Sequence, residues 1–142
     1  MAPRLKSMSE TNTSSQQSAS MMKTTSLLGL GITIAVVGMM VLGILLFTGN
    51  ESLRMMHEMI GYMVLVLGLA ASWCALRASS DTGSKGTFFH ALGVTVLMAL
   101  QIVLGKIGQA HVHMAVGALI LIGAIGLWTM AGRKAKALPE GA

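Results

Sequence analysis

Four long apolar runs constrain this chain more than any other feature, because each is close to the length of a membrane-spanning helix. They cover residues 25–48, 55–76, 88–105 and 112–131, and about 20 apolar residues cross the hydrocarbon core of a bilayer. With 54% hydrophobic and 11% charged residues, the chain is not an ordinary soluble domain. Its runs also lack the alternation of a membrane barrel. Short connections make neighbouring helices antiparallel, so the sequence predicts an all-α fold, an integral membrane antiparallel up-down four-helix bundle.

The lysines and arginines are distributed unevenly between the two ends of these runs. Those that flank one end are Arg4, Lys6, Lys23, Arg77, Lys85, Arg133, Lys134 and Lys136. Only Arg54 and Lys106 remain for the other end. Because basic residues concentrate in cytoplasmic loops, we expect both termini to be cytoplasmic and the protein to lie in a bacterial cytoplasmic (inner) membrane. This sorting also explains the net charge of +5 without nucleic acid as a partner.

Three segments follow from the polarity of the chain. Residues 1–24 form a polar segment, expected to be a flexible cytoplasmic tail. Residues 25–131 form the transmembrane bundle, and residues 132–142 form a short basic cytoplasmic tail. The single cysteine, Cys74, excludes an internal disulfide and a cysteine-based metal cluster.

Two histidines occur in matching contexts at the starts of the second and fourth runs. His57 and His113 are each followed by a glycine four residues later. An ionisable side chain within a membrane span indicates function by default. Both runs begin on the outer side, and diagonal helices of a bundle can share a cofactor in its core. The pattern predicts His57 and His113 as the two axial ligands of one b-type haem per chain; the alternative is two interfacial histidines that reach water.

The residues around this pair have two interpretations each. Gly61 and Gly117 lie one turn after the histidines, on the same helical face, and either leave room for a porphyrin or serve plain helix packing. Arg54 and Lys106 either bind haem propionates through charge-assisted hydrogen bonds or extend to water from a helix end.

The other two histidines are placed less favourably. His111 is about 200° around a helix from His113, so we expect it at the helix start, facing water, a propionate or a neighbouring subunit. An exchange of roles between His111 and His113 stays open. His90 begins the third run at the opposite end and is expected to be interfacial. Two or three histidines without a carboxylate at ligand spacing make a poor zinc site.

With these features the chain resembles one four-helix half of the haem A synthase family. The resemblance covers residues 25–131 and depends on His57, His113 and the run Gln101-Ile102-Val103-Leu104-Gly105 at the end of the third span. That family has eight spans in two similar halves, and each half carries a histidine at the start of its second and fourth spans. The resemblance therefore implies a haem-binding scaffold.

The chain also departs from that family. It has four apolar runs instead of eight, Glu51 and Glu58 are out of register with the family's acidic motif before the first histidine, and the loop cysteines of some members are absent. The resemblance therefore implies the scaffold more than the reaction.

Three functions are consistent with these observations. The leading hypothesis is a b-type haem-binding membrane protein with bis-histidine ligation, serving as an electron-transfer or accessory subunit of a larger membrane complex or a homodimer. Bis-histidine iron has no open position and suits electron transfer, so no catalytic residue is assigned. The alternatives are a haem A synthase-like enzyme or haem/oxidase assembly factor, and a structural membrane subunit without a cofactor.

Overall fold

The structure, a computed structural model, describes residues 2–82 and 85–138, with side chains over 13–79 and 85–138. Its elements are α1 (Ala2–Phe47), the short 3-10 helix η1 (Glu51–Leu53), α2 (Arg54–Thr82), α3 (Gly86–Lys106) and α4 (Ala110–Ala137). Four helices in the described part are long and apolar enough to cross a membrane. The predicted all-α membrane bundle is therefore confirmed.

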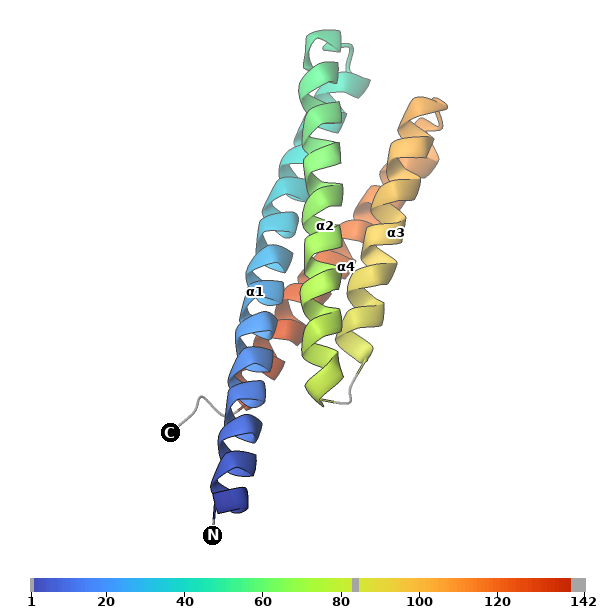
Figure 1. Cartoon of the computed structure of the whole chain (residues 1–142). Helices are drawn as coiled ribbons and strands as arrows, with labels where there is room; N and C mark the ends of the chain where they lie inside the picture. The colour runs from blue at the N-terminus through green and yellow to red at the C-terminus, as the bar shows by residue number, and fades with distance from the viewer. Residues whose placement is uncertain (1, 83–84, 139–142) are drawn as a thin grey trace.

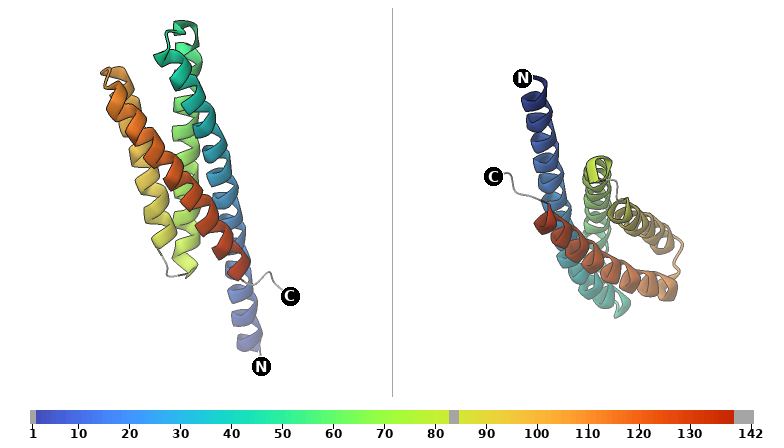
Figure 2. Two further views of the ribbon diagram at one scale, coloured as in Figure 1. Left: turned by 180° about the vertical axis from the view of Figure 1, so that it is seen from behind. Right: turned by 90° about the horizontal axis from the view of Figure 1, so that it is seen from below.

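The four helices form a ring in which each lies beside two others (Figure 1). α1 packs against α2 and α4, and α3 packs against the same two helices, whereas the backbones of the diagonal pairs make no close contact. The described ends of the chain lie at one end of the bundle, called here the termini end (Figures 1 and 2). The η1 turn and the connection between α3 and α4 lie at the other, the loop end. This is the up-down order predicted from the short connections.

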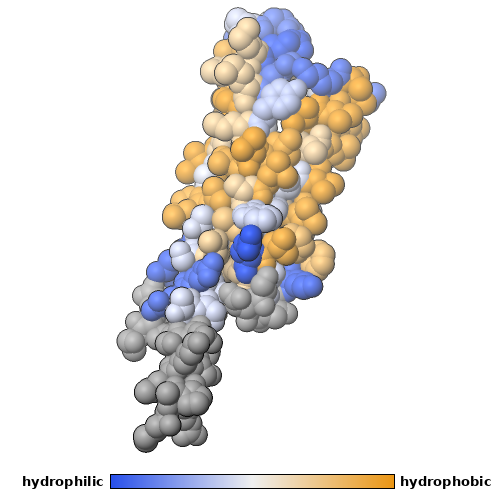
Figure 3. All heavy atoms as spheres, in the orientation of Figure 1, coloured by the Kyte–Doolittle hydropathy of each residue, from blue (hydrophilic) through white to orange (hydrophobic). Residues whose placement is uncertain are grey.

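The surface of the bundle is apolar where a bilayer would surround it. Figure 3 shows a hydrophobic middle with polar residues toward both ends. Large apolar side chains such as Leu27 and Ile34 are exposed, whereas Ala71, Ala75 and Ala124 are completely buried. Small residues inside and large apolar residues outside are the pattern of helices that pack closely in lipid.

Glycines and small polar residues join the two helical hairpins, α1–α2 and α3–α4. A Cβ atom at Gly29 of α1 would lie 2.8 Å from the backbone nitrogen of Trp128 in α4. Ser26 donates a hydrogen bond of 3.0 Å to the carbonyl of the same tryptophan. On the opposite seam, a Cβ at Gly68 of α2 would lie 2.9 Å from Thr95 Oγ1 in α3. At Gly29 the closest atoms are backbone, so that position requires glycine, whereas a side chain at Gly68 would require the Thr95 and Met98 side chains to shift.

Toward the loop end the two hairpins diverge. Figure 1 and the view from behind in Figure 2 both show the α1–α2 tip separated from the α3–α4 tip. A cavity lies between these tips and is lined by residues from all four helices.

Residues 2–24 of the polar segment lie within α1, which begins at Ala2 instead of near residue 25. No glycine or proline interrupts residues 4–28, and Pro3 is tolerated in the first turn of a helix. Near the termini end, Met22 is completely buried against Ala78, Ala131 and Ala135. The boundary at residue 25 thus marks a change of polarity within one helix, and flexibility of the segment stays a prediction. At the other terminus α4 continues to Ala137, so part of the predicted tail 132–142 is helical, and residues 139–142 lie outside the described range.

Candidate functional site

The cavity at the loop end has a volume of about 480 Å³. Ligand sites in proteins commonly have volumes of about 300–1,000 Å³ and are apolar with a few convergent polar groups. Here most lining side chains are apolar, and the polar ones include His57, Gln101 and His113. The cavity thus has the size and character of a site for a largely apolar ligand.

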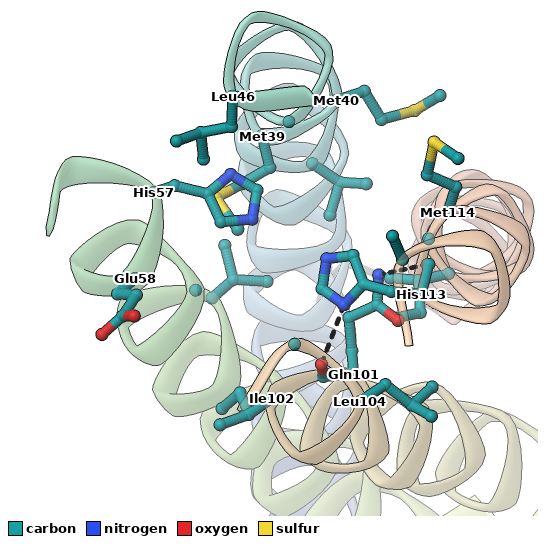
Figure 4. A pocket seen from close by; sticks show the side chains of 18 of the residues that line it. Met39, Met40, Leu46, His57, Glu58, Gln101, Ile102, Leu104, His113 and Met114 are labelled. Carbon is teal, nitrogen blue, oxygen red and sulfur yellow. Dashed lines mark hydrogen bonds between the residues drawn. The ribbon is translucent and has the colours of Figure 1, made fainter. Parts of the chain in front are cut away.

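His57 of α2 and His113 of α4 face one another across this cavity (Figure 4). Their ring centroids are 6.0 Å apart, and the ring planes are inclined by 46°. The backbones of these diagonal helices make no close contact, so the side chains alone bridge the space between them. The structure therefore brings together the two histidines that the sequence analysis paired.

The ring of His113 is fixed by one residue of α3. Its Nδ1 lies 3.0 Å from the backbone carbonyl oxygen of Gln101, and the Gln101 side-chain amide donates a 2.7 Å hydrogen bond to the carbonyl of His113. A carbonyl oxygen can only accept, so Nδ1 of the neutral ring carries the proton and Nε2 keeps its lone pair. The nitrogen without a hydrogen bond lies on the side of the ring that faces His57 (Figure 4). The lone pair of His113 Nε2 is therefore directed toward the His57 side of the cavity.

The surroundings of His57 are different. Its Nδ1 is buried and has no hydrogen-bond partner among the described residues. Its Cε1 lies 3.5 Å from the position that a Cβ would take at Gly43 of α1. The ring is therefore held by packing and not by a hydrogen bond.

Five glycines line the cavity, of which the sequence analysis singled out Gly61 and Gly117. A Cβ at Gly117 would lie 3.0 Å from Nε2 of Gln101, and one at Gly105 would lie 3.3 Å from Cε1 of His113. The other two are Gly43, beside His57, and Gly108. Gly117 therefore gives room both to the cavity and to the amide that fixes α4.

The two predicted propionate-binding cations also line the cavity, and each has a carboxylate partner. Arg54 Nη2 lies 2.6 Å from Glu51 Oε2, and Lys106 Nζ lies 2.7 Å from Glu58 Oε2. All four side chains are substantially exposed. The second pair connects α3 with α2, so the cavity rim carries both charges of an ion pair.

His111 and His90 do not line the cavity. His111 is exposed in the first turn of α4, in agreement with its expected position at the helix start. His90 lies in α3 near the termini end, and its Nε2 is 2.8 Å from the carbonyl oxygen of Gly123 in α4. His90 therefore contacts the neighbouring helix α4. The sequence analysis expected an interfacial residue and did not predict this contact.

Within residues 13–79 and 85–138, no three His, Cys, Asp or Glu side chains gather at metal-binding distance. Among the described residues, His57 and His113 are the two histidines that line the cavity.

Gln101 is the main site residue that sequence reasoning did not assign. It was noted only as part of a motif, although an amide within an apolar run is itself a polar group inside the membrane. Its side-chain Oε1 is buried without a hydrogen-bond partner in the described part of the chain. Methionines also gather at the cavity, as Figure 4 shows for Met39, Met40 and Met114.

Comparison with family models, curated proteins and solved structures gave no match to this chain. The resemblance to one half of a haem A synthase therefore depends on the quoted motifs alone.

Proposed function

We propose that this chain is a b-type haem-binding membrane protein in which His57 and His113 are the two axial ligands. The observation that carries the proposal is the opposed pair of imidazole rings, 6.0 Å between centroids, within a cavity built by all four helices. A porphyrin supplies four further donors to its iron, so two histidines complete the set.

The separation of the rings supports this ligation. When two imidazoles bind one metal from opposite sides, each metal–nitrogen bond is about 2 Å long and each nitrogen lies about 1 Å from its ring centre. The two ring centroids are then about 6 Å apart. The centroid distance of 6.0 Å in the structure agrees with this sum.

Other residues of the chain have supporting roles in the proposal. Gln101 holds His113 with Nε2 directed into the cavity, and the glycines keep the space beside the ligands free. Arg54 and Lys106 would exchange their carboxylate partners for haem propionates. Haem iron with two axial histidines supplies one-electron transfer, and the protein sets its potential through burial and hydrogen bonds.

The biological role follows from this chemistry. With the described ends of the chain at one end of the bundle and eight of ten basic residues assigned to that end, the termini are proposed to be cytoplasmic and the haem to lie near the outer face. A small protein with one haem and no assigned catalytic residue suits an electron-transfer or accessory subunit of a larger membrane complex.

Absorption spectroscopy of the purified protein, after expression with ample haem, tests the proposal. We expect one b-type haem per chain with a low-spin, six-coordinate spectrum. The double variant His57→Ala/His113→Ala should purify without haem, because it removes both iron ligands.

His111→Ala is the matched control, since it removes an exposed histidine of the same helix as His113 and should keep the spectrum. A colourless wild-type protein would reject haem binding and favour the structural-subunit hypothesis.

A further inference from the structure

The two histidines differ in what their Nδ1 atoms contact. Nδ1 of His113 lies 3.0 Å from the Gln101 carbonyl oxygen, and the Gln101 amide also binds the His113 backbone. Nδ1 of His57 is buried and has no partner among the described residues. The two histidines therefore occupy matching positions on α2 and α4, but only His113 has a hydrogen-bond partner for its Nδ1.

This asymmetry affects metal binding. A neutral histidine that binds a metal through Nε2 carries its proton on Nδ1. In His113 that proton has an acceptor, whereas in His57 it would be buried without one. A buried unsatisfied donor disfavours the state that contains it by about 5- to 150-fold in the equilibrium constant.

The glycines beside the two rings also show that His57 has fewer close neighbours on that side than His113. A Cβ at Gly43 would meet only Cε1 of His57, at 3.5 Å, with no other atom within 4 Å. A Cβ at Gly105 would meet His113 at both Cε1, 3.3 Å, and Nδ1, 3.5 Å. A Cβ added on the neighbouring helix would therefore approach the His57 ring at one atom and the His113 ring, more closely, at two.

From these contacts we infer that His113 is the permanent axial ligand and that the His57 position is an exchangeable coordination site for a small neutral ligand. The inference rests on the proposed haem site. It changes the function of the site from electron transfer alone to electron transfer with reversible binding of a small molecule, such as a diatomic gas or a free imidazole.

The first experiment compares His57→Ala with His113→Ala by absorption spectroscopy. His57→Ala should retain haem in a five-coordinate form that added imidazole returns to low spin. His113→Ala should lose haem affinity by about 10- to 100-fold more, because it removes the ligand that has a second-shell partner.

The second experiment titrates the ferrous wild-type protein with carbon monoxide. The gas should bind in place of His57, and the spectrum of the adduct should match that of the His57→Ala adduct, because His113 would be the remaining protein ligand in both.

A third experiment keeps His57 and adds a hydrogen-bond acceptor for its Nδ1 proton. Gly43→Ser places a hydroxyl beside the ring, where it can accept the Nδ1 proton, and should weaken carbon monoxide binding about tenfold, within the range for one unsatisfied donor. Gly38→Ser is the matched control, because Gly38 is exposed on the same helix outside the cavity and a Cβ there meets nothing within 4 Å; that variant should bind carbon monoxide like the wild type.

The outcomes separate the two proposals. Wild-type protein without haem overturns the haem site itself. If wild-type haem does not bind carbon monoxide, or if both alanine variants lose haem equally, the proposed difference between His57 and His113 is wrong while the haem site stands. An adduct that matches His113→Ala instead would also overturn that difference.

Discussion

Replacement of Gly117 by leucine should separate haem binding from folding. Gly117 lines the cavity, and a Cβ there would lie 3.0 Å from Nε2 of Gln101. The new side chain has two consequences: it displaces the amide that binds the His113 carbonyl at 2.7 Å, and it enters space beside the ligand. Without haem the cavity accommodates the leucine, so we expect the bundle to fold.

The expected loss of haem affinity follows from these two effects. One lost hydrogen bond is worth about 0.5–1.5 kcal/mol, and overpacking costs about 1–3 kcal/mol. Together they weaken binding by about ten- to a thousandfold, at about 1.4 kcal/mol for each factor of ten. Titration of the apo protein with haem, followed by absorption, measures the change directly.

Gly93→Leu is the matched control, because Gly93 is exposed on α3 and a Cβ there meets nothing within 4 Å. That variant should bind haem like the wild type, and circular dichroism should show full helix content in both. Undiminished haem affinity in Gly117→Leu would refute the reasoning and return Gly117 to plain helix packing.

Three further predictions concern topology, packing and the cavity rim. Reporter fusions after Asn50 should be active on the outer side and fusions after Lys85 on the cytoplasmic side; the opposite result would reverse the assigned orientation. Gly29→Val should lower the stability of the bundle by about 1–3 kcal/mol in denaturant unfolding, since its Cβ would approach the α4 backbone to 2.8 Å, whereas Gly31→Val, with nothing within 4 Å, should be neutral. Lys106→Ala should reduce haem affinity severalfold while changing apo stability by less than about 1 kcal/mol, because its ion pair is exposed; equal haem affinity would remove Lys106 from the site.

The fold was predictable because lipid imposes few solutions on long apolar runs. Helix number, antiparallel order and the diagonal relation of His57 and His113 all follow from run length and short connections. The start of α1 was not predictable in the same way, because the change of polarity near residue 25 coincides with no helix breaker. Polarity reports where the bilayer would begin, and not where a helix begins.

The contacts of the candidate site were harder to foresee than its position. The hydrogen bonds between Gln101 and His113 depend on the rotation and height of α3 relative to α4, and the periodicity of either helix specifies neither quantity. The same holds for Lys106 and Glu58, which lie on different helices and meet only because α2 and α3 pack side by side.

The two hairpins meet closely at Gly29 and Gly68 and diverge at the loop end (Figure 1). Helices are stiff rods, so a small increase in spacing at these contacts becomes a larger increase at the tips. Neither glycine lines the cavity. Evolution or a protein engineer can therefore widen or narrow the ligand space through substitutions at the seams, and leave the chemistry of His57 and His113 unchanged.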